Sequence, residues 1–113
     1  MKTRAKIEFG DFQTPVVLAR EVCALLIRQA IEADSVVEPT CGVGAFLVAA
    51  AEAFPKAKLY GWDINRGYVE QAEKALADAG TIGRAKIGQQ DFFSHDWEKE
   101  LSGIRGRLLI LGN

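Results

Sequence analysis

The hydrophobic positions of the chain fall into short apolar runs separated by longer stretches with helical periodicity. A short run rich in branched or aromatic side chains is typical of a strand, whereas apolar residues three and four apart indicate a helix that faces a core. The alternation of the two patterns predicts an α/β fold in which helices flank a mostly parallel sheet. Strands are predicted at 36–37, 59–63, 84–88 and 107–111, and helices at 15–33, 45–53, 66–79 and 94–103.

The first predicted helix has a clear start signal. Thr14 is a good N-cap, and Pro15 suits the first helical position because its missing amide would have no partner there. The residues expected on the core face of this helix are Leu18, Val22, Leu25, Leu26 and Ala30.

The last two predicted strands differ in composition. The run 84–88 has few apolar residues, which is typical of an edge strand. The run 107–111 is continuously apolar after Arg107, and this pattern predicts burial on both faces of the sheet.

The composition indicates one small globular domain. The chain has 113 residues, of which 49% are hydrophobic and 26% charged, and this balance excludes a disordered chain. The net charge of −1 gives no sign of the basic face that nucleic-acid-binding modules carry. No signal peptide and no membrane-spanning apolar run is present in the sequence, so a cytoplasmic location is expected.

Cysteine and histidine give no metal-ligand pattern. Cys23 and Cys41 form no Cys-x-x-Cys pair, and no histidine stands at ligand spacing, so no metal site is predicted. The single histidine, His95, lies in a polar stretch, and we interpret it as a surface residue rather than a catalytic base.

The turn after the first strand carries the strongest chemical signal. Glu38 ends the strand, and Gly42 and Gly44 stand where the absence of a Cβ atom lets the backbone approach a ligand. The amides that open the following helix then point at whatever lies over the turn. Leu47 replaces the third small residue of a dinucleotide motif, and no Gly-Lys-Ser/Thr phosphate loop is present. The turn therefore predicts a cofactor loop, with an ordinary strand-to-helix turn as the alternative.

Glu38 favours a ligand with positive charge, because a carboxylate repels phosphate but suits an ammonium group beside a sulfonium. The pattern Glu38-Pro39-x-Cys41-Gly42-x-Gly44-x-Phe46 resembles the glycine-rich motif of class I S-adenosylmethionine-dependent methyltransferases, and more narrowly that of DNA adenine methyltransferases of restriction-modification systems. The resemblance implies a Rossmann-like sheet in the order 3-2-1-4 and S-adenosylmethionine as the cofactor. It assigns cofactor contacts to Glu38, Thr40, Cys41, Gly42, Gly44 and Phe46.

The segment before the first helix strengthens this resemblance. In many DNA adenine methyltransferases an aromatic-x-Thr-Pro segment leads the domain and closes over the methionine end of the cofactor. Phe12, Thr14 and Pro15 match that segment and precede the glycine turn, as they do in that subgroup. The alternative is that Thr14-Pro15 only starts a helix.

The second predicted strand ends at a further acid. Asp63 follows Gly44 by about 20 residues, the spacing of an acid that binds ribose hydroxyls in nucleotide folds. The alternative is an N-cap for the helix that begins near Asn65. By the resemblance, Ile64 packs on one face of the adenine.

The segment after the third predicted strand is also similar to a family motif. Asp91-Phe92 resembles the Asp-Phe motif, in which the carboxylate accepts from the adenine amine and the ring stacks on the base. The alternative is a loop cap at Asp91 and a core residue at Phe92.

The fourth predicted strand leads to Asn113. In this family it delivers an Asn-Pro-Pro-aromatic or Asp-Pro-Pro-aromatic motif that accepts hydrogens from the target amine and stacks on a flipped base. Asn113 matches the first, catalytic residue of that motif, without the prolines. The resemblance implies a cofactor-binding domain fragment over 1–113, with a lead and helix at 1–33 and a Rossmann-like half at 34–113. DNA contacts are expected from the missing part of the parent protein, and self-association from an exposed fourth strand.

Three other functions remain open at the level of the sequence. Methyltransferases of RNA, protein or small molecules share parts of the same motifs. A non-catalytic binding or interaction module would need no complete active site. A nicotinamide-binding domain is disfavoured by Leu47.

Overall fold

Four parallel strands form the centre of the computed structural model, which describes residues 13–112. Their order across the sheet is β3-β2-β1-β4, so the predicted order 3-2-1-4 is confirmed. Val36 is in register with Leu59 on one side and with Leu109 on the other. The strands are β1 (Ser35–Glu38), β2 (Lys58–Asp63), β3 (Ala85–Gln89) and β4 (Leu108–Ile110).

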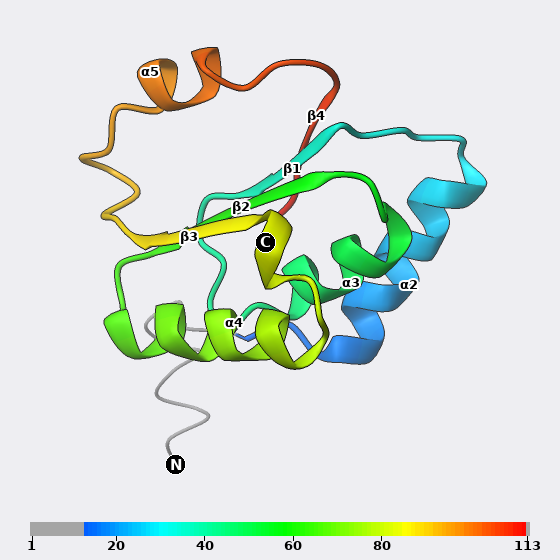
Figure 1. Cartoon of the computed structure of the whole chain (residues 1–113), viewed down its shortest axis with the longest axis horizontal. Coiled ribbons are helices and arrows are strands. Elements are labelled where there is room, and N and C mark those ends of the chain that lie inside the picture. The colour runs from blue at the N-terminus through cyan, green and yellow to red at the C-terminus, as the bar shows by residue number, and fades with distance from the viewer. Residues whose placement is uncertain (1–12, 113) are drawn as a thin grey trace.

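Helices cover the two faces of this sheet unequally. Figure 1 shows α2, α3 and α4 together on one side and α5 on the other. The α/β class inferred from the alternating pattern is therefore confirmed. The helices are α2 (Val16–Arg28), α3 (Ala45–Ala53), α4 (Arg66–Asp78) and α5 (Trp97–Ser102), with a 3-10 turn η1 at Ile82–Arg84. Within residues 13–112, no helix combines the length and the apolar character needed to cross a bilayer.

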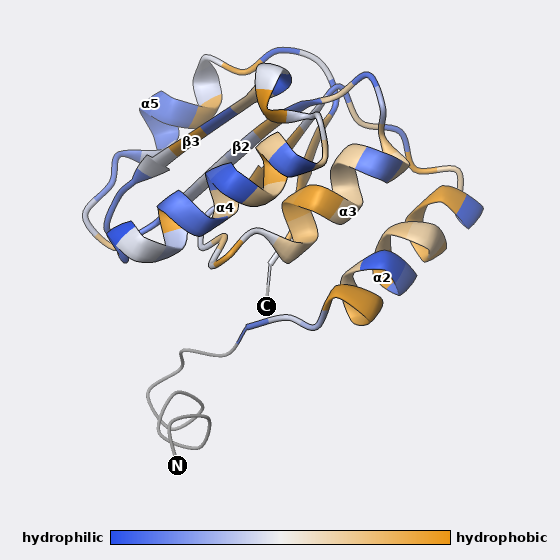
Figure 2. Cartoon of the chain, turned by 60° about the horizontal axis from the view of Figure 1, so that its bottom comes forward, coloured by the Kyte–Doolittle hydropathy of each residue, from blue (hydrophilic) through white to orange (hydrophobic). Residues whose placement is uncertain are grey.

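The core lies between the sheet and the layer of three helices. Helix α3 is largely apolar, whereas α4 presents polar residues outward (Figure 2). Leu47 on α3 and Leu59 on β2 are fully buried in this core. Small residues of α2, Ala19 and Cys23, face the alanine-rich α3 and let the two helix backbones approach closely.

The predicted core face of α2 is wrong in part. Val22 and Leu26 are half-buried against the core, but Leu18 and Leu25 are 45% and 47% exposed. The helix is apolar on more than one side, and its smallest residues rather than its largest occupy the contact with α3. Periodicity alone does not distinguish these faces, because both carry apolar side chains.

Both ends of α2 also differ from the sequence prediction. Pro15 rather than Thr14 is the N-cap, and no side chain caps the helix. The helix ends at Arg28 instead of 33, because Ala30 adopts a left-handed φ of 59° and the amides of Ala30 and Ile31 bond back to the last turn. This hydrogen-bonding pattern is a Schellman-type helix end.

The fourth strand is buried on one face only, so the prediction of burial on both faces is wrong. Leu109 packs against the core and Leu111 is 9% exposed, whereas Leu108 and Ile110 are 36% and 53% exposed. Because successive side chains of a strand alternate between the two faces, the exposed pair lies on the face opposite the core that Leu109 contacts, and among the described helices only α5 lies on that face (Figure 1). The strand is an edge of the sheet there, and β3 is the other edge, as predicted.

Arg84 holds the end of α3 to the start of β2. Its guanidinium donates to the carbonyl oxygens of Ala51 at 2.7 Å, Phe54 at 3.1 Å and Ala57 at 2.6 Å. All three acceptor residues are buried, so water does not replace the lost donor. We expect Arg84→Met to lower the free energy of unfolding by about 1.5–3 kcal/mol, the range for hydrogen bonds to a charged group.

Urea denaturation of both variants provides the measurement, with Arg66→Met as the matched control. Among the described residues, Arg66 forms only an exposed pair with Glu70, whose loss is expected to change stability by less than about 0.5 kcal/mol. Equal effects in the two variants would contradict the role assigned to Arg84.

Candidate functional site

The candidate site lies where β1 ends and α3 begins. Gly42 and Gly44 have φ angles of +55° and +92°, a region that side chains with a Cβ rarely adopt. The turn is closed by a hydrogen bond from the Gly44 amide to the Cys41 carbonyl at 3.0 Å. The Cys41 amide donates to the Trp62 carbonyl at 2.8 Å and so joins the turn to β2.

Glycine is also required in this region by close packing. A Cβ atom on Gly44 would lie 3.1 Å from the Cα and Cβ atoms of Ala72 on α4. A Cβ atom on Gly61 in β2 would lie 2.6 Å from Cδ1 of Leu47. Leu47, at the position where dinucleotide folds have a small residue, therefore packs closely against β2 at Gly61. The sequence signal for Gly61 was a glycine inside a strand, which marks a close approach.

Gln13 is a contributor that the motifs did not identify. Its Oε1 atom accepts from the Val43 amide at 3.2 Å and lies 2.3 Å from where a Cβ on Gly42 would be. The segment that precedes α2 thus contacts the glycine turn directly. This contact brings the neighbouring Thr14, which is half-buried, to the same end of the sheet.

Asp63 connects the turn to the next helix. Its Oδ2 atom accepts from the Gly42 amide and its Oδ1 atom from the Asn65 amide, each at 2.9 Å. The N-cap of α4 is Asn65, whose side chain accepts from the Tyr68 amide at 3.2 Å. Each carboxylate oxygen can accept more than one hydrogen bond, so Asp63 retains acceptor capacity toward a ligand.

Glu38 is the least satisfied polar side chain of the site. It is 3% exposed, and its Oε1 atom is the buried side-chain atom that lacks a hydrogen-bond partner within residues 13–112. Burial, followed by the charge of the nearby Asp63, raises the pKa of its carboxyl from 4.5 to about 8. A buried acceptor without a donor fits a ligand that brings N–H groups.

Cys41 lies within the same buried cluster. Its side chain is 4% exposed and packs beside Gly61. Burial, followed by the charges of Glu38 and Asp63, raises the pKa of its thiol to about 12. The thiol is therefore protonated at neutral pH and does not supply a nucleophile.

The ends of β2 and β3 meet beside this cluster. The Gln90 amide donates to the Asp63 carbonyl at 3.1 Å and holds the two strand exits together. Ile64 and Phe92 are 63% and 40% exposed, so both present apolar surface at this end of the sheet. Asp91 is exposed, and its Oδ1 atom accepts from the Phe93 amide at 3.0 Å.

An aromatic cluster supports Phe92 from behind. The Trp97 indole nitrogen donates to the Phe92 carbonyl at 2.7 Å, and its ring lies 5.3 Å from that of Trp62. His95 packs on Trp97 at 4.6 Å and pairs with Glu100 at 3.0 Å, with only 14% of its side chain exposed. The interpretation of His95 as a surface residue is therefore wrong, because α5 folds its polar segment onto the sheet.

The remaining predicted residues lie at varied depths. Phe46 is buried in the core at 6% exposure, whereas Thr40 and Pro15 are exposed. Phe12 and Asn113 lie outside the described residues.

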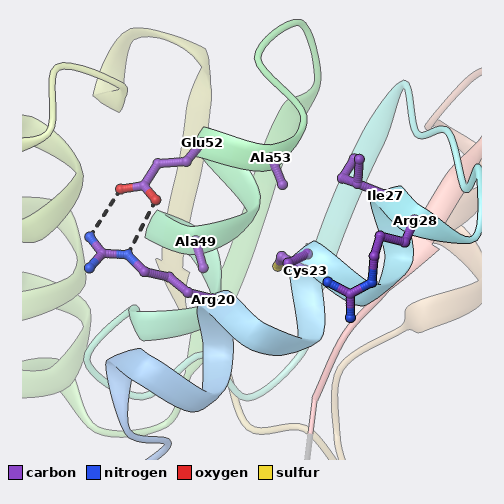
Figure 3. Close-up of a pocket in the computed structure, with 8 residues that line it drawn as sticks. Arg20, Cys23, Ile27, Arg28, Ala49, Glu52 and Ala53 are labelled. Carbon is purple, nitrogen blue, oxygen red and sulfur yellow. Dashed lines mark hydrogen bonds and ion pairs between the residues drawn. The ribbon is translucent and has the colours of Figure 1, made fainter.

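A separate pocket of about 400 Å³ lies between α2 and α3. Figure 3 shows its apolar floor and the Arg20 guanidinium bonded to Glu52 at its rim. The two charged side chains are more than half exposed, so this pocket is a surface crease rather than a buried polar site. Its lining comes from α2 and from the α3 positions 49, 52 and 53, at the other end of α3 from the glycine turn.

Comparison with known proteins gives the class. The chain is 38% identical over 112 residues to the Type II methyltransferase M.NspV of a Nostoc species, and the aligned region covers 97% of this chain and 23% of that protein. It is 28% identical over 92 residues to the Type II methyltransferase M.VspI of a Vibrio species, and the aligned region covers 80% of this chain and 22% of that protein. No family model matches the chain.

The fold comparison agrees. The O-methyltransferase TomG from Streptomyces achromogenes, solved in complex with SAM, matches 98% of this chain and 51% of its own, with a TM-score of 0.72 and 19% identity. The chain has the Rossmann-like fold of methyltransferases. More narrowly, it resembles Type II methyltransferases, which confirms the resemblance predicted from the glycine motif. The chain spans about a quarter of the length of these two curated relatives.

Proposed function

We propose that the chain is the S-adenosylmethionine-binding part of a DNA methyltransferase that acts on the exocyclic amine of adenine. The observation that carries the cofactor assignment is the buried Glu38 carboxyl, whose Oε1 atom has no hydrogen-bond partner within residues 13–112, beside a glycine turn at the carboxyl end of β1. A methionine ammonium supplies the N–H donors that this carboxyl lacks. Ligands of open α/β sheets bind at the carboxyl ends of the strands, which is where this cluster lies.

The other residues of the cluster divide the cofactor among them. Asp63 accepts from the ribose hydroxyls with its remaining lone pairs. Ile64 and Phe92 enclose the adenine, and Asp91 accepts from its amine. Phe12, Thr14 and Pro15 close over the methionine end, while the turn is shaped by Thr40, Cys41, Gly42, Gly44 and Phe46.

The DNA substrate is inferred from the Type II methyltransferases and from the motif resemblance. Asn113 is proposed as the first residue of the motif that binds the target amine. Since the curated relatives are about four times longer, the DNA contacts and the rest of the active site are assigned to further sequence of the parent protein. Residues 1–113 alone are expected to bind cofactor without methylating DNA. A cytoplasmic location is proposed because the proposed DNA substrate is found there.

Calorimetry with S-adenosylmethionine and with NAD tests the cofactor assignment. We expect S-adenosylmethionine to bind more tightly, because its ammonium group donates to the Glu38 carboxyl, which NAD does not match, and because Leu47 fills the place of a small residue. Tighter binding of NAD would overturn the proposal.

The ribose role of Asp63 needs a sharper test, because Asp63 also holds two backbone amides. We expect Asp63→Ala to weaken binding of S-adenosylhomocysteine by about 1–3 kcal/mol. Removing the 2′ and 3′ hydroxyls from the ligand is expected to weaken its binding to the unmodified 113-residue chain. The same removal is expected to leave its binding to the Asp63→Ala variant unchanged, and the comparison is a double-mutant cycle. Equal losses in both proteins would assign Asp63 a structural role only.

The exposed edge of the sheet supports one further proposal. Leu108 and Ile110 leave an apolar strip on an edge strand, and such strips favour association. We expect the 113-residue chain to form dimers or larger species in sedimentation experiments, and Ile110→Lys to shift it toward the monomer. If the unmodified 113-residue chain stays monomeric at high concentration, the proposed self-association is refuted.

A further inference from the structure

The buried carboxyl of Glu38 has no charge partner in the described part of the chain. The titratable groups that face it from the surrounding elements are Asp63 on β2, Cys41 in the turn and Cys23 on α2. None of them is cationic, and Asp63 repels a second negative charge. With Oε1 unpartnered, an ionised Glu38 would be a buried and unsolvated anion, which is strongly unfavourable.

In the ligand-free protein these surroundings therefore favour the neutral acid. The carboxyl pKa of about 8 places most of this group in its protonated form at pH 7. A bound ammonium group reverses this preference, because an opposite charge within a few ångströms favours the ionised carboxylate.

We propose that binding of S-adenosylmethionine removes one proton from Glu38. This inference rests on the proposed function. It means that the binding equilibrium of the cofactor includes the release of one proton. The O–H bond of the Glu38 carboxyl breaks, the proton passes to the solvent, and the carboxylate accepts a hydrogen bond from the ligand ammonium. No covalent bond to the ligand forms or breaks.

Glu38 thereby selects for the amino-acid end of the cofactor. A ligand that carries the same nucleoside but no ammonium, such as 5′-methylthioadenosine, leaves the carboxyl neutral. Such a ligand binds without proton release and without a pH dependence from this group.

Calorimetry of the 113-residue chain between pH 6 and 7, in buffers with different heats of ionisation, measures the protons released. The ligand amine stays protonated in this range, because amino groups of this kind titrate near pH 8. We expect about one proton released for each S-adenosylmethionine bound, and a dissociation constant that falls about tenfold from pH 6 to pH 7. We expect no release with 5′-methylthioadenosine.

Glu38→Gln is the matched variant, since the amide has the same shape and does not titrate. It is expected to abolish proton release, whereas Glu52→Gln on the surface of α3 keeps it. Binding of S-adenosylmethionine to the unmodified chain with no proton release would overturn this inference and leave the proposed function intact. Absence of binding to the unmodified chain would overturn both. Release of a proton with 5′-methylthioadenosine, a measurement on the unmodified chain, would show that another group titrates and would also overturn the inference.

Discussion

Gly44→Ala is expected to lower the free energy of unfolding by about 2–5 kcal/mol. Two effects add at this position. A residue with a Cβ atom at a φ of +92° is strained by about 1–2 kcal/mol, and an atom 3.1 Å from the Ala72 backbone adds overpacking of about 1–3 kcal/mol. Because the neighbour is helix backbone rather than a flexible side chain, α4 has to shift away from the turn. We expect cofactor binding to be lost as well.

Two other glycines separate these effects in urea denaturation. Gly80 has a φ of +76° with open space around it, so Gly80→Ala reports strain alone, at about 1–2 kcal/mol. Gly83 has neither a positive φ nor a close neighbour, so Gly83→Ala is expected to change stability by less than about 1 kcal/mol. If Gly44→Ala costs no more than Gly80→Ala, the contact with α4 does not constrain the turn.

Glu38→Gln is expected to flatten the dependence of stability on pH in the absence of cofactor. The folded carboxyl has a pKa of about 8, against 4.5 for an ordinary one, so the folded chain binds more protons than the unfolded chain between these values. Stability from this group is therefore fully present below pH 4.5 and is lost as the pH rises to about 8. At about 1.4 kcal/mol for each pH unit, the loss is at most about 5 kcal/mol.

Denaturation at pH 5 and pH 8 checks this sign. The unmodified chain is expected to lose stability between the two pH values, and the Glu38→Gln variant is expected to lose less. Other groups titrate alike in both proteins, so the difference reports Glu38. Parallel losses would show that Glu38 ionises normally in the folded chain. A fall in the stability of the parent toward acid across this window, absent in the variant, would reverse the sign.

The order of the elements follows from local sequence signals. The limits of α3 agree with its predicted range, because Gly44 opens the helix and Pro55 follows its end within two residues. The parallel sheet and its order agree with the alternating pattern and the family resemblance. The side of α2 that faces the core was not predictable in this way, because Leu18 and Ala19 are both apolar and only the shape of α3 selects the smaller one.

The sequence by itself determined the class of fold, the glycine turn and the acids at the ends of β1 and β2, because each depends on residues close together in the chain. Only the tertiary structure decided the burial of these acids, their hydrogen-bond partners and the charges near them. The Asp63 carboxylate meets the Gly42 amide across 21 positions of sequence, and Gln13 meets Val43 across 30. The pKa of Glu38 likewise depends on the elements that surround it. Burial and electrostatic repulsion arise between segments distant in sequence, and no local pattern of residues specifies them.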